Sequence, residues 1–516
     1  MRQRHRYAVS CILALAIVAL ASSGCDSGGE QTFTVPKPAV QVGDQRPNVV
    51  VIVTDDQTLE SFNEAVMPRA VRALAERGTA FSQAIVSTPQ CCPSRAGYLT
   101  GQYSQNNGVT SNDPGYPLLR DKPSVLPSWL QAAGYETIHV GKYLNGYYTA
   151  EGLTPGPGWD SWQSLVSSDY EDSIWSIDGD KKTYSDTYLT TTLNDFATDA
   201  IRRQAGADRP FYLQIDHLGP HVGSGNEGGP CKGGAVPDPS DADAFPDAQA
   251  PRNPATREAD VSDKPQFLQQ RFQIGPANAA EADRLYRCTL QSLQSVDRGV
   301  AGIVSALRET GELGNTMIIF TSDNGFSFLE HRVLATKGMP YEEHLRVPLV
   351  IRPPRNFPKP ARSGAVLPAP VANIDLAPTI LELADAQPCW ETDTCRRMDG
   401  RSLLPLLQGD EPGWASKRAL RTGFDIGAPN YGLSCAWDGL RTPRQALIDH
   451  VLLPEPGTFA CKPADELEYY ELESDPFQLR GDRPIPPGLE ARLDRLRRCS
   501  GIKGRDSRLP ETPFCE

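Results

Sequence analysis

The stretch Arg46–Asp56, which reads RPNVVVIVTDD, restricts the fold of this chain more than any other segment. Every residue from Val49 to Thr54 is β-branched, and the run is bounded by the polar residues Asn48 and Asp55. A strand that is apolar on both faces has to be covered on both faces, which is typical of a parallel strand inside a sheet. The run therefore predicts an α/β fold, with helices on both sides of a mostly parallel sheet.

Other segments support this fold. Short apolar runs predict further strands at Tyr135–Val140, Pro210–Ile215, Thr316–Thr321 and Val347–Ile351. Helical spacing of apolar residues predicts a helix at Met67–Arg77 and one or two helices at Ala282–Thr310. Strands that alternate with helices indicate crossover connections and a mostly parallel sheet. The segment Val222–Phe272 is rich in Gly, Pro and Asp, and its length predicts an ordered functional loop near a site.

The length of 516 residues exceeds that of one typical domain and leaves room for a second, smaller one. Composition changes near residue 410. Beyond that point, strand-like runs at Gln445–Leu453 and Leu467–Leu472 precede a basic helix at Pro487–Arg498. We expect a large α/β domain at residues 47–410 and a small sheet-plus-helix domain at residues 411–516.

The N-terminus has the pattern of an export signal. A basic start precedes the apolar run Tyr7–Ala21, which is short for a spanning helix, so residues 1–24 are predicted to be a signal peptide. The run is followed by Ser22-Ser23-Gly24-Cys25, which resembles a bacterial lipobox with serine in the usual place of leucine. Two outcomes are possible: lipidation of Cys25, which would anchor the protein to the outer face of the cytoplasmic membrane, or cleavage and secretion. Residues 25–46 are expected to be a flexible tether.

The formal net charge of −13 disfavours nucleic acid and anionic membrane surfaces as main partners. A membrane contact is expected only through a lipid on Cys25. A small anionic substrate is still compatible with this charge, because a local basic pocket can override the field of the whole protein.

Four of the expected strands end in ionisable or metal-binding residues. Because sites form at the carboxyl ends of parallel strands, we expect these residues to share one site. They are Asp55-Asp56, Gly141-Lys142, His217 with His221, and Asp323-Asn324. The first and last pairs offer only oxygen ligands, which favour Ca²⁺ or Mg²⁺ over Zn²⁺. Taken singly, these pairs are also explained as ordinary turns at strand ends.

The segment Cys91–Gly101 reads CCPSRAGYLTG. Pro93 suits the first turn of a helix, which would place Cys91 at a helix N-terminus that favours an anion. Adjacent cysteines can also be structural or disulfide-bonded. The pattern C-x-P-S-R with the following Thr-Gly resembles the sulfatase signature, in which a formylglycine-generating enzyme oxidises the first cysteine to formylglycine. The resemblance places this aldehyde at Cys91.

The resemblance to sulfatases covers nearly all of the chain after the signal. It includes the motifs RPNVVVIVTDDQ, VGKYLNGY, GPH, EADVSDKPQ, TSDNGFSFLEHR, KGMPYEEHLRVP and YELESDPFQ. GKYLNGY and DVSDKP are most similar to the N-acetylglucosamine-6-sulfatase and heparan endosulfatase group. The resemblance implies an alkaline-phosphatase-like fold with residues 47–410 as the catalytic domain. It also implies hydrolysis of sulfate esters on sulfated sugars such as 6-O-sulfated glucosamine.

The family's functional residues match positions of this sequence. The implied calcium ligands are Asp55, Asp56, Cys91, Asp323 and Asn324. Arg95 would hold the hydrated aldehyde, and Lys142 and Lys337 would bind sulfate oxygens. His221 would contact sulfate and protonate the leaving alcohol, because an unactivated sugar alkoxide leaves poorly. One hydroxyl of the hydrate would attack sulfur and the other would lose its proton to expel sulfate, whereas serine would be left as a stable ester.

The chain departs from the broad family in one motif, reading GKYLNG where many sulfatases read GKWHLG. The family's histidine is absent there, and His217 or His331 is expected to take its part, with His217 as a candidate substrate-binding residue. His139 lies in an apolar strand and is expected to be a core residue. His344 and Arg346 either line the pocket or cap a helix.

The cysteines indicate disulfides. Cys11 and Cys25 belong to the signal and Cys91 to the expected site, and Cys92 is expected to be buried and unpaired. The other eight form an even set in an exported protein, which indicates disulfides. The spacing does not determine the connectivity. Pairing of sequence neighbours would give Cys231–Cys288, Cys389–Cys395, Cys435–Cys461 and Cys499–Cys515.

Two rival interpretations stay open. The first is an arylsulfatase, phosphonate monoester hydrolase or phosphodiesterase on the same scaffold. Two-metal members of that class bring extra His and Asp ligands, whereas this chain has seven histidines and one oxygen-rich cluster, which favours one hard cation. The second is a lipid-anchored glycan-binding protein without catalysis, against which the intact set of Cys91, Arg95, Lys142, His221 and Lys337 argues.

Overall fold

The computed structural model describes residues 46–224, 228–271, 273–358, 363–389, 395–425, 435–455, 460–499 and 515. The predicted signal peptide, its Cys25 and the tether up to residue 45 lie outside the described residues. Within the described ranges, no helix combines the length and the apolar character that crossing a bilayer requires.

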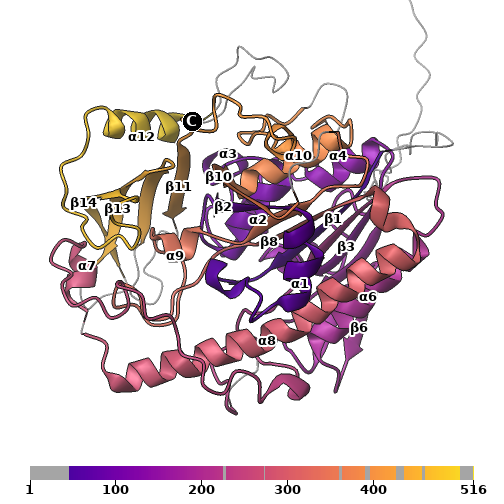
Figure 1. Ribbon diagram of the computed structural model, residues 1–516, viewed down its shortest axis with the longest axis horizontal. Coiled ribbons are helices and arrows are strands. Elements are labelled where there is room, and N and C mark those ends of the chain that lie inside the picture. Colours follow the sequence, from indigo (N-terminus) through magenta and orange to yellow (C-terminus); the bar gives the residue numbers. More distant parts are fainter. Residues whose placement is uncertain are drawn as a thin grey trace, which may run out of the picture. The chain divides into compact units, whose positions relative to one another are not determined.

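A ten-stranded, mostly parallel sheet contains the expected strands, in the order β10-β2-β9-β8-β1-β7-β3-β4-β5-β6 (Figure 1). The continuous apolar run is the fully buried β1 (Asn48–Thr54), which pairs in parallel with β7 (Phe211–Asp216) and β8 (Thr316–Ser322). β3 (Glu136–Lys142) pairs in parallel with β7. The parallel centre of the sheet is therefore confirmed. The other strands are β2 (Thr79–Ile85), β4 (Ser161–Leu165), β5 (Ser173–Ile177), β6 (Asp180–Tyr184), β9 (Leu349–Arg352) and β10 (Ala365–Ala372).

Not all strands of this sheet are parallel. The strand predicted at Val347–Ile351 is β9, and it runs antiparallel to both of its neighbours, β2 and β8. At the end of the sheet where β6 is the outermost strand, β5 is antiparallel to both β4 and β6. The sheet is therefore mixed, as expected for this fold class. Every antiparallel pair in it includes β9 or β5, whereas β8, β1, β7 and β3 run parallel to one another.

Helices cover both faces of the sheet and form a hydrophobic core on each. Successive residues of β1 point to opposite faces, so they contribute to the two cores in turn. Val49, Val51 and Val53 pack in one core with α2 (Cys91–Thr100), α4 (Leu126–Ala132) and α10 (Leu376–Leu383). The intervening Val50 and Ile52 pack in a second core with α1 (Pro68–Ala73), α6 (Leu189–Arg203) and α8 (Pro276–Glu309). The stretch predicted as one or two helices is thus the single helix α8, which begins six residues before Ala282. Shorter helices are α3 (Ser104–Asn107), α5 (Tyr147–Glu151), α7 (Gln266–Gln269), α9 (Glu342–Leu345) and α11 (Leu404–Leu407).

A second, four-stranded antiparallel sheet follows, with a helix after it. It consists of β11 (Leu420–Asp425), β12 (Ala436–Arg441), β13 (Gln445–Pro454) and β14 (Cys461–Glu471), and the helix is α12 (Leu489–Arg498). Leu489, Leu493 and Leu496 of α12 pack against this sheet through one apolar cluster. The small sheet-plus-helix unit is confirmed, whereas its boundary at residue 411 stays a prediction.

Buried polar contacts attach the small sheet to the segment that carries Lys337. Arg441 of β12 donates to both carboxylate oxygens of Glu342 in α9, over 3.0 and 2.9 Å. Trp437 Nε1 donates to the Gly338 carbonyl oxygen over 3.0 Å. Away from this segment, a fully buried bidentate pair with two bonds of 2.7 Å joins Arg418, just before β11, to Asp375, just before α10. The small sheet therefore supports one wall of the site described below.

The cysteines pair with their sequence neighbours. The structure contains the disulfides Cys231–Cys288, Cys389–Cys395, Cys435–Cys461 and Cys499–Cys515. Cys91 and Cys92 are buried and unbridged. This outcome confirms the even set of eight bridged cysteines and the unpaired state of Cys92.

Candidate active site

Four neighbouring strands bring polar side chains to one edge of the large sheet. β8, β1, β7 and β3 lie side by side in this order and run parallel. The register pairs Thr54 with Ser322, so Asp55 and Asp323 follow at adjacent positions. The Asp323 backbone N–H donates to the Thr54 carbonyl oxygen over 3.0 Å. The polar strand ends are therefore gathered at one edge, as the sequence predicts.

Helix α2 brings Cys91 to the same edge. The helix begins at Cys91, directly after Gln90 in an extended conformation, and Pro93 lies in its first turn. It ends before Gly101, whose φ of 65° lies in the left-handed region that glycine adopts readily. All ten residues of α2 are buried. The prediction that Cys91 opens a helix is confirmed, and this helix start lies in the protein interior.

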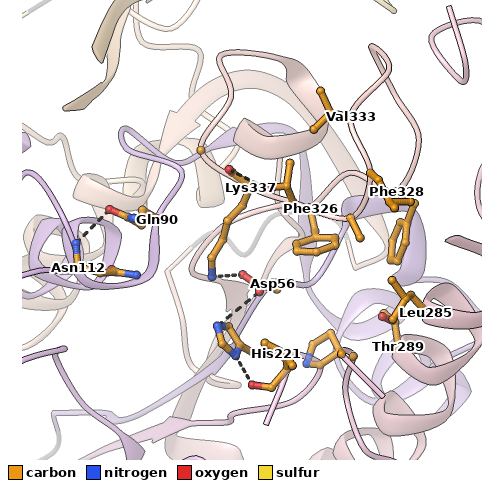
Figure 2. A pocket seen from close by; sticks show the side chains of 18 of the residues that line it. Asp56, Gln90, Asn112, His221, Leu285, Thr289, Phe326, Phe328, Val333 and Lys337 are labelled. Atoms are coloured by element: carbon orange, nitrogen blue, oxygen red, sulfur yellow. Dashed lines mark hydrogen bonds and ion pairs between the residues drawn. The ribbon is translucent and has the colours of Figure 1, made fainter. Parts of the chain in front are cut away.

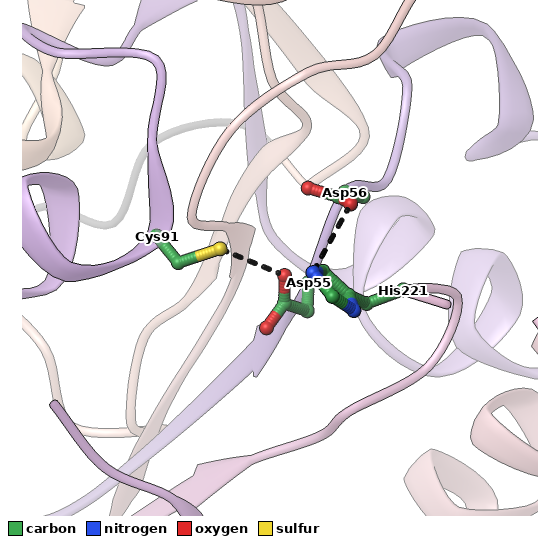
Figure 3. A group of neighbouring side chains, drawn as sticks. All are labelled: Asp55, Asp56, Cys91 and His221. Carbon is green, nitrogen blue, oxygen red and sulfur yellow. Dashed lines mark hydrogen bonds and ion pairs between the residues drawn. The ribbon is translucent and has the colours of Figure 1, made fainter. Parts of the chain in front are cut away.

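Cys91 lies among charged groups (Figure 3). Its Sγ is 3.3 Å from Asp55 Oδ1 and 2.8 Å from Lys337 Nζ. Burial, together with the negative charge of Asp55, raises the pKa of the Cys91 thiol to about 12. The interpretation of Cys91 as a disulfide cysteine is therefore wrong, because its sulfur is unbridged and faces the acidic cluster.

The acidic residues form one connected group. Asp56 has a φ of 66°, a left-handed conformation that aspartate tolerates better than most residues. Its backbone N–H donates to Asp323 Oδ1 over 3.3 Å, and Asn324 Nδ2 donates to Asp56 Oδ1 over 2.6 Å. One ligand atom from each of Asp55, Asp56, Cys91 and His221 lies within 4.8 Å of the others. Two carboxylates thus meet a thiol and an imidazole, with Asp323 and Asn324 bonded directly to Asp56.

The donor chemistry of this group suits a hard cation. Asn324 Oδ1 is buried and, among the residues that the structure describes, accepts no hydrogen bond. A buried amide oxygen without a donor is costly unless something positive faces it. Carboxylate and amide oxygens are the ligands that Ca²⁺ and Mg²⁺ prefer. The oxygen-rich edge can therefore hold a divalent cation of this kind.

Two lysines balance the carboxylates. Lys142, the last residue of β3, donates to Asp55 Oδ2, and Lys337 donates to Asp56 Oδ1. Burial disfavours the charge on Asp55, yet the nearby ammonium of Lys142, with further cations, holds the pKa of that carboxyl well below its usual range. Burial also disfavours the charge on Lys337, but Asp56 and the other acidic groups around it together outweigh burial and raise the pKa of this lysine. Asp55 and Lys337 are thus both charged at neutral pH.

Arg95 connects the ends of four strands. Its Nε donates to Asp323 Oδ2 over 2.8 Å, and its Nη2 donates to Asp55 Oδ2 over 3.3 Å. Its Nη1 donates to Asp216 Oδ1 over 2.9 Å and to the Lys142 carbonyl oxygen over 3.1 Å. The side chain is 1% exposed. One residue of α2 therefore contacts β8, β1, β7 and β3 or the residues that directly follow them.

His221 lies in the wall of a cavity of about 460 Å³ next to these charges (Figure 2). Its Nδ1 is 2.6 Å from the Val222 carbonyl oxygen, and its Nε2 is 3.8 Å from Asp56 Oδ2. Burial lowers the pKa of this imidazole. Lys337 and Asp56 line the same cavity, and its lining also includes the apolar side chains of Leu285, Phe326, Phe328 and Val333. The cavity thus joins the charged cluster to a partly apolar chamber.

The predicted functional loop contributes to this cavity. Val222, Gly233, Gly234 and Arg271 of the Val222–Phe272 segment line it. The disulfide Cys231–Cys288 ties the loop to α8 close to the two glycines. The segment is therefore an ordered neighbour of the site over its described residues.

The other histidines are placed away from the cavity lining. His217 is fully buried, and neither ring nitrogen has a hydrogen-bond partner among the described residues. Burial lowers its pKa to about 4. The described cavity is not lined by His217, whose role as a substrate contact stays a prediction. His331 is also buried, and its Nδ1 lies 2.8 Å from Glu258 Oε2.

His139 is a core residue, as expected, with its ring stacked on Trp162 at a centroid distance of 4.7 Å. His344 is buried in α9, and Arg346 directly follows that helix as its C-cap residue. Neither His344 nor Arg346 lines the described cavity, and Arg346 Nη2 donates to the Ser82 carbonyl oxygen over 2.8 Å. The helix-capping interpretation therefore fits Arg346 better than a place in the pocket.

Sequence reasoning missed Asp216 as a member of the site. This residue ends β7 and contacts Arg95, so it belongs to the same charged group. The sequence did offer a signal for Asp216, since it lies at the end of a predicted strand, as Asp55 and Asp323 do. Gln90 and Asn112, which line the cavity beside α2, were missed as well. No local pattern in the sequence marks these two residues.

Comparison of the chain with known proteins shows the family to which it belongs. The chain matches the sulfatase family over residues 47–386 and a family described as N-sulphoglucosamine sulphohydrolase, C-terminal, over residues 330–481. The chain therefore belongs to the sulfatase family.

Three curated relatives illustrate the similarity. An arylsulfatase of Volvox carteri is 35% identical over 66% of this chain and 56% of the relative. The extracellular sulfatase SULF-1 homolog of Drosophila melanogaster is 33% identical over 70% of this chain and 31% of the relative. The N-acetylglucosamine-6-sulfatase of Homo sapiens is 33% identical over 72% of this chain and 66% of the relative. The chain thus spans about half the length of the curated relatives that it matches.

A solved structure confirms the fold class. It contains a protein in complex with its substrate, D-glucosamine-2-N,6-O-disulfate, and it covers 87% of this chain and 96% of its own. The TM-score is 0.65 at 22% sequence identity. The shared fold is the alkaline-phosphatase-like one that the sequence resemblance implies.

The His331–Glu258 pair leads to a prediction about stability. Burial opposes the charge on His331, but the carboxylates of Glu258 and Glu343 together outweigh burial and raise the pKa from 6.5 to about 9. A charged His331 therefore stabilises the folded state fully below about pH 6.5, and this contribution is lost as the pH rises through about 9. His331→Gln should lower the denaturation midpoint strongly at pH 6, at a cost of about 3 kcal/mol, and only weakly at pH 10.

Chemical denaturation of both proteins at pH 6 and pH 10 measures this difference. Equal losses at the two pH values would show that the stabilisation comes from packing on Tyr341, whose ring centroid is 4.0 Å from that of His331, rather than from charge.

Proposed function

We propose that this protein hydrolyses sulfate esters with a nucleophile that is formed from Cys91 by oxidation to formylglycine. The observation that carries the proposal is the place of Cys91. It opens a buried helix, and its unbridged sulfur lies 3.3 Å from the Asp55 carboxylate and 2.8 Å from the Lys337 ammonium. Membership in the sulfatase family supports the same chemistry. A formylglycine-generating enzyme would act on Cys91 during maturation.

The oxygen donors of the cluster would hold Ca²⁺, with Mg²⁺ as the alternative. The ligands would be Asp55, Asp56, Asp323, Asn324 and the residue formed from Cys91. Two observations support this set: Asn324 Oδ1 accepts no hydrogen bond within the described part of the chain, and the Asp56 backbone N–H donates to the Asp323 carboxylate. A bound dication would supply positive charge next to the sulfate group and to the hydrated aldehyde.

The chain's own cations would receive the sulfate group. Lys142 and Lys337 would bind its oxygens, since their ammonium groups lie beside Asp55 and Asp56, and Lys337 and Asp56 line the cavity. Arg95 would stabilise the Cys91-derived hydrate from the helix side, although its present hydrogen bonds go to carboxylates. Fixed cations that face developing negative charge lower the barrier of such a reaction.

His221 would protonate the leaving alcohol. It lies in the cavity wall, and its Nε2 faces Asp56 over 3.8 Å. A sugar alkoxide is a poor leaving group, so a proton donor at this position contributes to the rate. His217, which is buried and does not line the described cavity, stays a candidate substrate contact.

The substrate would be a sulfated sugar such as 6-O-sulfated glucosamine. The names of the human relative and of the substrate in the solved structure support this choice. The cavity of about 460 Å³ lies in the range of small-molecule sites. An aryl sulfate is the second candidate, favoured by the apolar wall of Phe326, Phe328, Leu285 and Val333. The rivals are a phosphonate monoester or phosphate diester substrate and a glycan-binding protein without catalysis.

The protein would act outside the cell. A signal peptide at residues 1–24, a possible lipid on Cys25 and a tether at residues 25–46 would precede a catalytic domain at 47–410 and a small domain at 411–516. The extracellular location in the name of the Drosophila relative and the four disulfides support export.

Replacement of Cys91 tests the nucleophile. Cys91→Ala should lower desulfation by at least about a thousandfold, because the attacking group is gone. Cys91→Ser should accumulate a serine sulfate ester, which makes the protein heavier by one transferred SO3 group. Peptide mass analysis of the native protein should find the aldehyde or its hydrate at this position. Cys92→Ala, which changes the adjacent buried thiol, is the matched control and should keep turnover.

Full activity of Cys91→Ala would refute the nucleophile. An unmodified thiol at Cys91 in protein from an exporting bacterial host would favour the glycan-binding rival. Faster turnover of a phosphonate monoester or phosphate diester than of any sulfate ester would favour the first rival.

Removal of Asp323 tests the metal. Asp323→Ala takes away one expected ligand and one partner of Arg95, so Ca²⁺ affinity should fall by about a hundredfold or more and turnover should be lost. Isothermal titration calorimetry on metal-stripped protein measures the affinity. Asp297→Asn, a buried carboxylate bonded to the start of α1, should bind Ca²⁺ like the unchanged protein. Unaltered Ca²⁺ binding by Asp323→Ala would contradict the ligand assignment.

Removal of His221 tests the proton donor. His221→Ala should lower kcat on a sugar sulfate by about 10²–10⁴-fold. The loss should be much smaller on an aryl sulfate whose phenolate leaves without help. Steady-state kinetics on glucosamine 6-sulfate and on 4-nitrophenyl sulfate make the comparison. Losses of the same size on both esters would remove His221 from this role.

A further inference from the structure

Asp216 is a buried carboxylate that neither the proposed metal site nor the proposed sulfate site uses. It ends β7, beside the strand that leads to Asp55, and its side chain is 1% exposed. Unlike Asp55 and Asp56, it has no atom in the group of ligand atoms that gather within 4.8 Å. A buried carboxylate needs compensating partners, because transfer of a charge out of water is costly.

Both oxygens of Asp216 are fully engaged. Oδ1 accepts hydrogen bonds from Arg95 Nη1 over 2.9 Å and from the Tyr98 hydroxyl over 2.8 Å. Oδ2 accepts one from Gln214 Nε2 over 2.7 Å and lies 3.2 Å from His139 Nε2. With three hydrogen bonds in place and the His139 ring beside it, this carboxylate is not available to a cation. Its effect on the site has to pass through Arg95.

The partners of Asp216 are themselves held in place. The His139 ring stacks on Trp162 and packs edge-on against Tyr143, with centroid distances of 4.7 and 5.3 Å. Gln214 Nε2 also lies 3.0 Å from the Tyr98 hydroxyl, which closes a small hydrogen-bonded ring on Asp216. The carboxylate is therefore held rigidly between β3, β7 and α2, as the support of a functional group requires.

Arg95 binds one oxygen of each of two carboxylates in the proposed metal site. It donates hydrogen bonds to Oδ2 of Asp323 and to Oδ2 of Asp55. The other oxygens are turned into the cluster, since Asp55 Oδ1 faces Cys91 Sγ and Asp323 Oδ1 accepts from the Asp56 backbone. The guanidinium can bind only these two outer oxygens while its Nη1 is held away from the cluster. Asp216 is the carboxylate that accepts the hydrogen bond from Nη1.

We propose that Asp216 is a positioning residue that fixes the Arg95 guanidinium, so that Asp55 and Asp323 each keep one oxygen directed at a bound cation. This inference rests on the proposed calcium site. Without the charge of Asp216, Arg95 loses one of its three carboxylate partners and competes with the cation for the remaining two. The consequence is weaker metal binding, with the contacts to the sulfate group left in place.

Asp216→Asn tests the proposal, because it keeps the shape and removes the charge. Ca²⁺ affinity, measured by calorimetry on metal-stripped protein, should fall by about 10–100-fold. At low Ca²⁺ concentration kcat should fall as well, at saturating Ca²⁺ it should largely recover, and KM for the sulfate ester should change little. Recovery by Ca²⁺ is a readout that general loss of structure would not give.

Asp375→Asn is the matched control. Asp375 is also a fully buried carboxylate bound by an arginine, Arg418, through two bonds of 2.7 Å outside the site. This variant should lose stability and keep its Ca²⁺ affinity. Tyr98→Phe is a milder second variant that removes one hydrogen bond to Asp216, and it should weaken Ca²⁺ binding by about two- to tenfold.

The outcomes separate this inference from the proposed function. Unchanged Ca²⁺ affinity in Asp216→Asn and Tyr98→Phe, with loss of affinity in Asp323→Ala, would overturn the role of Asp216 and leave the metal site intact. An equal loss of affinity in Asp375→Asn would also overturn it, because the effect would then be one of general stability. Absence of Ca²⁺ and Mg²⁺ binding by the unchanged protein would overturn the metal site and this inference together.

Discussion

The arrangement of the site depends on one side chain, Arg95. Its guanidinium donates to carboxylates at the ends of three strands and to the backbone of a fourth. Without these bonds the buried carboxylates would repel one another and resist ionisation, since like charges at short range in a poorly hydrated interior interact strongly. Because Arg95 lies on α2 four residues after Cys91, the same bonds fix the helix start that carries the proposed nucleophile. The sheet edge and the nucleophile are thus positioned by one set of charge-assisted hydrogen bonds.

The remaining charges are arranged around this anchor. Lys142 comes from the strand beside β7, and Lys337 comes from a segment that the small C-terminal sheet supports through Trp437 and Arg441. The pocket wall on that side is therefore a product of both sheets. The ion pair of His331 with Glu258 joins the same segment to the long loop, which in turn is bridged to α8 by Cys231–Cys288. These contacts hold the charged side chains in fixed positions. Electrostatic catalysis relies on charges that need no reorganisation during the reaction.

Much of the fold and of the site could be predicted from the sequence, because short stretches of residues determine the elements that build them. The β-branched run of β1 has to be covered on both faces, and Pro93 restricts the backbone so that a helix starts near Cys91. Parallel strands place their carboxyl ends at one edge, so Asp55 and Asp323 could be brought together without knowledge of the packing. The small C-terminal sheet and its helix were also visible as short periodic segments. The antiparallel course of β9 was not, because the direction of a short strand leaves no mark on its sequence.

By itself, the sequence determined the fold class, the starts and ends of the central elements and the residue types that meet at the strand ends. Only the tertiary structure decided which charges pair there. Asp216 is 121 residues from Arg95, and His331 is 73 residues from Glu258, so neither partner is marked by a local pattern. His331 and His217 looked equally suited to replace a missing histidine, yet the structure buries both outside the cavity lining. The physical reason is that local backbone preferences act over a few residues, whereas the pairing of buried charges depends on which elements the completed core brings into contact.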